Sequence, residues 1–286
     1  MADATPDTDD PSQKRMTFWE HIEELRDRLK SVLIVLMVLF VLFLTFSLGS
    51  VTIAGVQVPM IFPAFASDQS PMANQFFLML KAYLVPPIVN GLPLHFSFKT
   101  PWDGVLVQIK AAMFLAVLVG SPVIAYELGR FIGPALKPSE RRLILRVTVP
   151  VLVLFLAGIA LCYVVVLPFT FRLLYSVQTT VGADFLVLFA DDFISFTLLF
   201  LLAFGLAFQL PVLMYALSWL GVVGADFWKK YWRFAAVAIF IFGAIITPDG
   251  SGVTMMFVAL PMLVLYVIGY AASRYAEGHR IRAKSS

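Results

Sequence analysis

The sequence is poor in charged residues and almost free of cysteine. Only 14% of its 286 residues are charged and 60% are hydrophobic, against about 25% charged residues in ordinary soluble domains. The one cysteine, Cys162, lies inside an apolar run, so a single chain offers neither a disulfide framework nor a thiolate metal site. The net charge of +3 is too small to indicate nucleic-acid binding. These shortages favour a membrane protein.

The sequence also lacks the pattern of a secretory leader. Residues 1–16 are polar and acidic, with Asp3, Asp7, Asp9 and Asp10, whereas a leader begins with a basic region followed by an apolar stretch. We therefore predict a flexible N-terminal segment over residues 1–16, and a first apolar run that remains in the mature protein.

Apolar runs long enough to cross about 30 Å of hydrocarbon, at ~1.5 Å per residue, recur from Ser31 onward. They predict one all-α membrane domain over residues 31–272. Its six transmembrane helices are expected near Ser31–Leu48, Val105–Leu128, Leu143–Pro168, Phe193–Leu220, Phe234–Ile246 and Val253–Ala272. The fifth run offers only about 20 Å of helix, so a re-entrant segment is the alternative.

The basic residues predict the orientation. With six crossings, the N-terminus, the second and fourth loops and the C-terminus share one side, and that side holds 17 of the 21 lysines and arginines. The others are Lys81, Lys99, Lys110 and Arg172. The positive-inside rule makes the basic side cytoplasmic, including a basic tail over residues 273–286. A re-entrant fifth segment would send this tail outside, so we prefer six spans.

Two segments on the opposite side are too long to be simple turns. Residues 49–104 mix proline, glycine and aromatic residues with an amphipathic helix near Asn74–Val85, and residues 170–192 form a shorter polar stretch. We expect both to lie on the outer face of the membrane and form a cap.

The spans hold few polar groups. The clearest is Gln209, whose amide must find a partner on another helix or a hydrated cavity, and helix-to-helix hydrogen bonding is the simpler interpretation. No general acid, base, nucleophile or metal cluster can be assembled around it. The sequence therefore predicts no enzyme, no cofactor and no metal site.

Carboxylates gather on the predicted cytoplasmic side. A capping box at Thr17 to Glu20 and apolar residues on one face predict an amphipathic helix over residues 17–30, with Glu23, Glu24 and Asp27 on its polar side. This side is either a solvated face, with Glu24 paired to Arg28 four residues on, or a binding site. Glu140 stands in a basic loop, and Asp249 has the surroundings of a turn residue.

Five stretches, in order along the chain, resemble the TatC family of the twin-arginine translocase. They are His21 to Leu29 (HIEELRDRL), Ser121 to Tyr126 (SPVIAY), Phe131 to Arg142 (FIGPALKPSERR), Ala203 to Gly205 with Phe208 to Pro211 (FQLP), and Thr247 to Asp249 followed by Leu260 and Pro261. The resemblance implies a bowl-shaped six-helix receptor in the plasma membrane of a bacterium or archaeon. Such a receptor binds twin-arginine signal peptides of folded precursors, self-associates, and works with single-span TatA- and TatB-type partners using the proton motive force.

The resemblance also implies roles for particular residues. The two recognition carboxylates of the family fall on Glu24 and Glu140, with Arg26 and Phe131 in the same patch. Gln209 falls where members carry Glu or Gln and implies a partner contact within the membrane. Pro87 matches a proline of the outer cap, and Asp249 an acid of the last outer loop. Here a single proline precedes that acid instead of two, and Val267 stands where many members place an acid.

A secondary transporter of a small solute is the alternative function. It would need a substrate or ion site near the bilayer midplane, usually between two related halves of the chain. Gln209 and the proline and glycine breaks in the spans are the only candidates for such a site, and the sequence shows no convincing internal repeat.

Overall fold

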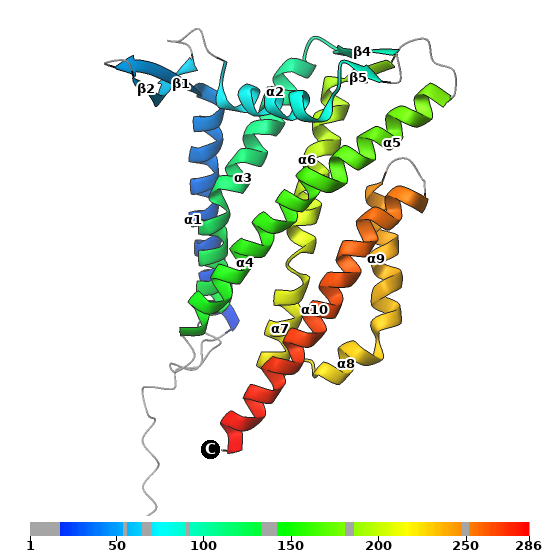
Figure 1. Cartoon of the computed structure of the whole chain (residues 1–286). Helices are drawn as coiled ribbons and strands as arrows, with labels where there is room; N and C mark the ends of the chain where they lie inside the picture. Colours follow the sequence, from blue (N-terminus) through cyan, green and yellow to red (C-terminus); the bar gives the residue numbers. More distant parts are fainter. Residues whose placement is uncertain are drawn as a thin grey trace, which may run out of the picture.

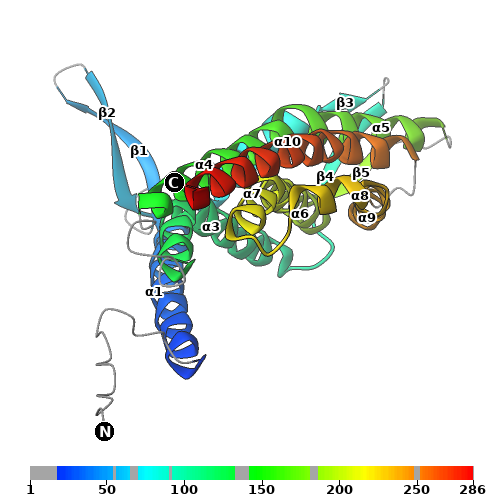
Figure 2. The same cartoon turned by 90° about the horizontal axis from the view of Figure 1, so that it is seen from below.

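The computed structural model describes residues 18–53, 56–64, 70–89, 92–132, 142–180, 186–247 and 252–285. The helical elements stand in a curved wall, with α1 and α9 at its opposite ends (Figures 1 and 2). They are α1 (Phe18–Thr45), α2 (Met72–Leu84), α3 (Asp103–Ile132), α4 (Arg142–Leu161), η5 (Cys162–Val166), α5 (Leu167–Thr180), α6 (Ala190–Ala207), α7 (Leu210–Leu220), α8 (Ala225–Lys230), α9 (Trp232–Ile246) and α10 (Gly252–Ser285).

The two ends of this wall differ in what they carry. The first residues of α1 and the last residues of α10 lie at the same end, together with α8, and we name this the terminal end (Figure 1). The strands and α2 lie at the other end, which we name the capped end. Both Lys99, between β4 and α3, and Lys110, in the first turns of α3, belong to the capped end.

Within the described ranges, five helices are long and apolar enough to span a membrane, and a sixth helix is apolar but shorter. The five are Ile22–Thr45, Asp103–Arg130, Thr148–Val177, Ala190–Leu220 and Gly252–Gly278, and the sixth is Trp232–Ile246. The prediction of six spans is confirmed. The short span, α9, has 15 residues and is about 22 Å long, less than the ~30 Å thickness of the hydrocarbon core.

Helix α1 joins two predicted elements in one. It runs without a break through the expected amphipathic segment and the first span. Helix α10 likewise continues through the predicted basic tail to Ser285. Helices α4, η5 and α5 also follow one another directly, from Arg142 to Thr180, because the single π-helical turn η5 adds a residue to the helix without ending it.

Proline and glycine set the path of the fourth span. Pro211, in the first turn of α7, has no N–H to donate to the carbonyl of Ala207, where α6 ends. Helix α6 packs very closely on α4, since a Cβ on Gly158 would lie 2.6 Å from the carbonyl oxygen of Phe204. A Cβ on Gly205 would lie 2.7 Å from the ring of Phe155. Small residues allow this approach, as is usual between helices in membranes.

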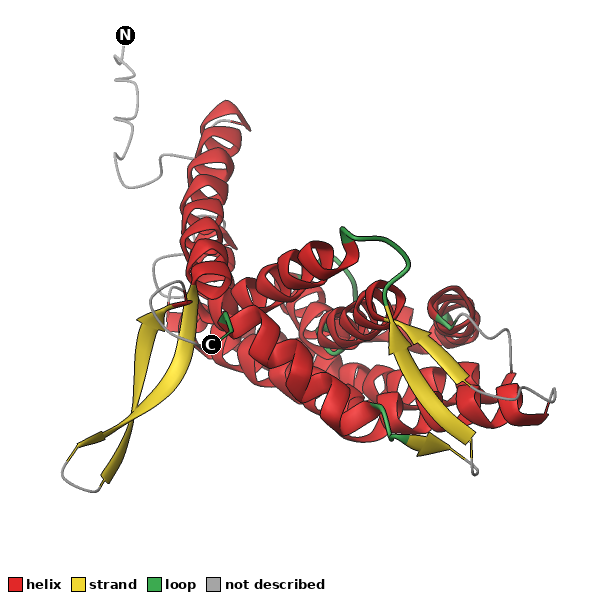
Figure 3. Ribbon diagram, turned by 90° about the horizontal axis from the view of Figure 1, so that it is seen from above, coloured by secondary structure: helices red, strands yellow, loops and turns green. Residues whose placement is uncertain are grey.

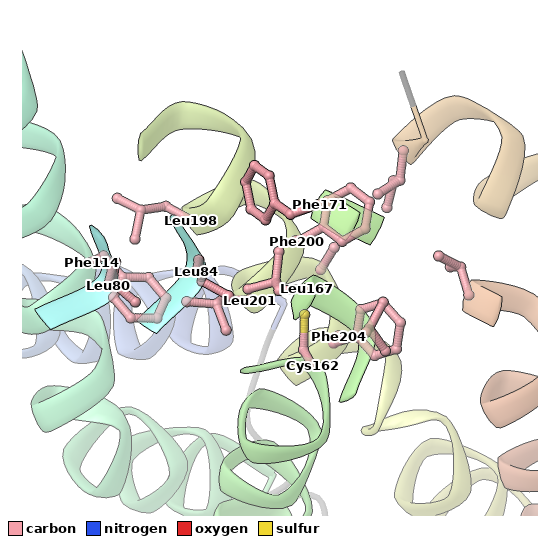
Figure 4. Packing of buried hydrophobic residues seen from close by; sticks show 14 of the residues in the cluster. Leu80, Leu84, Phe114, Cys162, Leu167, Phe171, Leu198, Phe200, Leu201 and Phe204 are labelled. Carbon is pink, nitrogen blue, oxygen red and sulfur yellow. The ribbon is translucent and has the colours of Figure 1, made fainter. Parts of the chain in front are cut away.

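The largest apolar core lies where η5 and α5 pack against α6 and α2. Phe193, Phe200 and Phe204 from α6 are almost completely buried there. Cys162 is also fully buried and lies close to Leu167 and Phe204 (Figure 4). Its thiol therefore acts as a small packing group.

The capped end contains short strands that the sequence analysis did not anticipate. Strands β1 (Phe46–Ile53) and β2 (Val56–Pro63) form an antiparallel ribbon, with Phe46 opposite Pro63, that projects to one side of the helices (Figure 3). Strands β3 (Ile88–Val89), β4 (Leu92–Ser97) and β5 (Leu186–Phe189) form a second sheet, in which β4 and β5 are parallel. Helix α2 lies where the amphipathic helix was expected.

Candidate functional site at the terminal end of α1 and α3

The candidate site begins with the packing of α1 along α3. This contact brings the second and third turns of α1 beside the last turns of α3 at the terminal end (Figure 1). Arg28 of α1 donates from Nη2 to Oε1 of Glu24, at 3.0 Å, and from Nη1 to Oε2 of Glu127, at 3.1 Å. One guanidinium therefore bridges two helices through two different carboxylates.

These three side chains are largely shielded from solvent. The exposed fractions are 15% for Glu24, 12% for Glu127 and 23% for Arg28. Because two carboxylates share one guanidinium, the group carries a formal net charge of −1. Oε2 of Glu24 is buried and accepts no hydrogen bond from the described part of the chain. Such an oxygen costs roughly 1–3 kcal/mol when it is left without a donor.

The rest of the polar side of α1 is different. Arg26 contacts Glu23 at 3.0 Å and Asp27 at 3.4 Å, and more than half of each of these side chains is exposed. Exposed pairs of this kind contribute about 0–1 kcal/mol. The solvated-face interpretation thus fits Glu23, Arg26 and Asp27. The predicted contact between Glu24 and Arg28 is present, but it is buried and extended by Glu127.

The other residues of the expected patch are only partly within the described structure. Phe131 belongs to the last turn of α3, in the same part of the helix as Glu127. Glu140 lies in residues 133–141, outside the described ranges, and so does Asp249. Pro87 lies at the capped end between α2 and β3, exposed, and its carbonyl accepts the N–H of Leu94 at 3.0 Å.

Gln209 stands at the break between α6 and α7, away from Glu24. Its Nε2 donates to the carbonyl of Val151 in α4, at 3.1 Å, and to that of Gly205, at 3.4 Å. Its Oε1 is buried without a hydrogen-bond partner among the described residues. The amide therefore makes the helix-to-helix contact that was the simpler interpretation of its position.

Glu127 is the residue of this site that the sequence analysis missed. It is an acid at the end of the second predicted span, whereas the prediction of the membrane sides rests on the cations alone. An ionisable residue at that depth is itself a signal for a pairing or binding role. The spacing to Phe131, one helical turn later in a stretch already singled out, would have placed Glu127 beside the patch.

Two further ion pairs, which join α6 at the capped end to α3 and to the loop before it, were also not predicted. Lys110 contacts Asp191 of α6 and donates to Oγ of Ser195 at 2.9 Å. Lys99 contacts Asp192. In the ranges that the structure covers, no group of three or more His, Cys, Asp or Glu is placed to hold a metal ion.

Comparison with known proteins identifies the family. Residues 20–261 match the model of the family described as "Sec-independent protein translocase protein (TatC)". A TatC protein of Cenarchaeum symbiosum is 38% identical over 95% of this chain and 98% of its own length. A TatC protein of Aquifex aeolicus is 31% identical over 72% of this chain and 86% of its own length.

The fold gives the same result. A crystal structure described as the "Twin Arginine Translocase Receptor- TatC" superimposes with a TM-score of 0.69 and 28% identity, over 90% of this chain and 99% of the other. None of these matches supports the small-solute transporter. With a family model that covers most of its length and relatives that align nearly end to end, the chain belongs to the TatC family of Sec-independent protein translocase proteins.

Proposed function

We propose that this chain is the receptor subunit of a twin-arginine translocation system and binds the signal peptides of folded precursor proteins. Membership of the TatC family and the likeness to a twin-arginine translocase receptor support this function. The observation that carries the site is the buried Oε2 of Glu24, which has no donor in the described part of the chain. An arginine of a signal peptide brings the N–H groups that this oxygen lacks.

The geometry suggests how the first arginine is read. Arg28 holds Oε1 of Glu24 and leaves Oε2 without a donor in the described part of the chain, while Glu127 holds the other side of Arg28. An incoming guanidinium would donate to Oε2 once the side chains that cover this buried oxygen move aside. A lysine ammonium offers neither the planar fork of N–H groups nor its fixed geometry. Glu140, with Arg26 and Phe131 nearby in the family patch, supplies the acceptor for the second arginine.

The membrane orientation and partners follow from the same proposal. The terminal end faces the cytoplasm, in keeping with the excess of basic residues there, and the cap with Pro87 and Asp249 faces outward. The membrane is the plasma membrane of a bacterium or archaeon. Single-span TatA- and TatB-type proteins bind within the membrane, with Gln209 as one contact, and the receptor self-associates in a complex driven by the proton motive force.

The test is binding of a twin-arginine signal peptide to the purified, detergent-solubilised protein, with a twin-lysine peptide for comparison. Glu24→Ala and Glu140→Ala should each weaken binding of the twin-arginine peptide by on the order of 1–3 kcal/mol, roughly five- to a hundredfold. In the double variant, the change from arginine to lysine in the peptide should cost little more. Glu23→Ala, which removes an exposed carboxylate from the same helix, is the matched control.

Full twin-arginine affinity in the double variant would exclude this site. An equal loss of affinity in Glu23→Ala would show that the effect comes from the overall charge of α1 and not from a site at Glu24. The orientation has its own test, in which single cysteines at positions 99 and 229 are labelled from outside intact cells. Labelling at 229 but not at 99 would invert the proposed topology.

A further inference from the structure

A second recess lies at the terminal end, where α8 and the start of α9 meet α10. Its cavity volume is about 380 Å³, within the range of small-ligand sites, roughly 300–1,000 Å³. One wall holds Trp228, Lys229 and Trp232, and the other, on α10, includes Leu263, Val267 and Tyr270. Helices α8 and α9, which form one wall of this groove, lie at the opposite end of the wall of helices from α1 (Figure 2).

Hydrogen bonds hold the groove open in this form. The hydroxyl of Tyr266 donates to the carbonyl of Trp228 at 2.7 Å, and the indole N–H of Trp228 donates to Oγ of Ser218 at 3.1 Å. A carboxylate oxygen of Glu277, near the end of α10, accepts the N–H of Ala225 at 2.9 Å. These contacts fix α8 across α7 and α10, so the groove is preformed.

Lys229 lines the groove, and Lys230 and Arg233 each follow a lining residue directly in the sequence. Lys229, Lys230 and Arg233 are exposed, and none of the three makes an ion pair with a carboxylate of the described ranges. Lys230 lies over the ring of Tyr231, at 5.5 Å from its centroid, and Arg233 over that of Trp232, at 5.7 Å. Arg274 follows one turn after Tyr270 on α10 and is also exposed.

The carboxylates at this corner do not neutralise these cations. Glu277 is engaged by the backbone of α8, and Asp226 is exposed in the first turn of α8. Neither is within ion-pair distance of Lys229. The α8 side of the groove therefore keeps an excess of positive charge.

The groove crosses from the membrane interior to its surface. From Leu263 to Tyr270 it extends about 10 Å along α10, with aliphatic side chains at the deeper end and aromatic rings with cations toward α8. Aromatic and basic residues together mark the interface of a bilayer. An acyl chain matches the aliphatic end of the groove, and an anionic headgroup matches the cations near α8.

We propose that this groove binds an anionic phospholipid from the leaflet at the terminal end. One acyl chain lies against Leu263 and Val267, and the phosphate lies beside Lys229, between the rings of Trp232 and Tyr270. The cations on the α8 side select the anionic headgroup, and each contributes about a fivefold preference over a zwitterionic one. The lipid would fill the space left beside the short helix α9.

Fluorescence quenching by brominated lipids tests this directly. A variant with Trp19, Trp102 and Trp219 replaced by phenylalanine keeps only Trp228 and Trp232, the two indoles of the groove. It is reconstituted in phosphatidylcholine bilayers that contain a small fraction of brominated phosphatidylglycerol or, in parallel, the same fraction of brominated phosphatidylcholine. We expect stronger quenching by the anionic lipid, and Lys229→Gln should lower this preference about fivefold.

Lys30→Gln is the matched control, since it removes an exposed lysine at the same end of the molecule but on α1. It should leave the preference unchanged. Equal quenching by the two brominated lipids would overturn the proposal. A partner helix would then be the favoured occupant of the groove. If Lys30→Gln lowered the preference equally, the anionic lipid would be attracted by the charge of the whole surface and not by this groove. Unchanged thermal unfolding of Lys229→Gln establishes that the variant is folded.

Discussion

The two ends of the molecule use charge in different ways. At the capped end, Lys99 has Asp192 and Lys110 has Asp191, so each cation has a carboxylate of its own. At the terminal end, Glu24 and Glu127 share Arg28, and one oxygen of Glu24 accepts no hydrogen bond from the described residues. The matched pairs fasten α6 to α3 and the loop before it. The unmatched group leaves one buried carboxylate oxygen without a donor in the described part of the chain.

Burial makes this difference sharper. The side chains of the two capped-end pairs are 25–57% exposed, whereas those of Glu24, Arg28 and Glu127 are 12–23% exposed. A buried charge without full compensation lowers stability, and apolar residues would pack as well there. The surplus carboxylate is therefore better explained by binding than by folding.

The largest expected effect is on the unmatched group. Arg28→Leu leaves two shielded carboxylates facing each other, and removal of one partner from such a group should lower the free energy of unfolding by about 2–4 kcal/mol. Thermal unfolding of the purified protein in detergent measures it. Arg26→Leu, on the exposed side of the same helix, should change stability by less than about 0.5 kcal/mol. Similar losses in the two variants would contradict the comparison.

The second prediction separates binding from folding at this end. In Glu127→Gln the side chain keeps its size but loses its charge. Both Nη1 and Nη2 of Arg28 are then free to donate to the two carboxylate oxygens of Glu24. Oε2 of Glu24 would then be occupied, and twin-arginine affinity should fall about tenfold, or ~1.4 kcal/mol. Peptide binding by the purified variant measures this, with an unchanged melting temperature as the control. Unaltered affinity would show that Glu127 only joins α1 to α3.

At the capped end we expect a smaller effect, and only on stability. Asp191→Asn leaves the half-buried Lys110 without its counter-charge and should cost about 1–2 kcal/mol of unfolding free energy. Asp192→Asn, at the more exposed pair, should cost about 0–1 kcal/mol. Neither variant should change signal-peptide affinity. A loss of affinity in Asp191→Asn with stability intact would mean that the capped end contributes to recognition.

The last prediction concerns Gln209, where we expect a smaller effect than at Asp191. Its two hydrogen bonds go to carbonyls of helical residues, which also accept within their own helices, so Gln209→Leu should lower the free energy of unfolding by only about 1 kcal/mol. Gln209→Asn, with a shorter amide, is the matched variant. Thermal unfolding of both in detergent measures the difference. If Gln209→Leu lowered the free energy of unfolding by more than Arg28→Leu does, Gln209 in the fourth span would make the more important polar contact of the two.

The helical framework could be predicted because long apolar runs have few alternatives to spanning a membrane. The strands could be predicted only in part. Residues 46–63 are rich in β-branched side chains on both sides of Ala54 and Gly55, a hairpin signal that the apolar composition obscured. The parallel pairing of Leu94 with Leu186 joins segments far apart in the chain. Such a pairing cannot be predicted from the local sequence pattern of either segment.

The candidate site divides in the same way. Glu24 and its contact with Arg28 follow from helical spacing, and the possible role of Glu24 follows from the family resemblance. Glu127 could not be assigned as the third member, because the register between α1 and α3 is set by the packing of two apolar helix faces. Sequence spacing within either helix says nothing about that register.

The π-helical turn η5 gives the third span one residue more than a regular α-helix would need. The N–H of Leu167 bonds to the carbonyl of Cys162, five residues earlier, and the buried positions step from Cys162 to Leu167, Phe171 and Tyr175. Because this turn holds five residues where a regular turn holds about four, deletion of one residue between 162 and 166 would restore regular α-helical spacing and leave α4 and α5 in phase. Phe171 and Tyr175 would then keep their places in the core. The turn is therefore the point at which this span best tolerates a change of length.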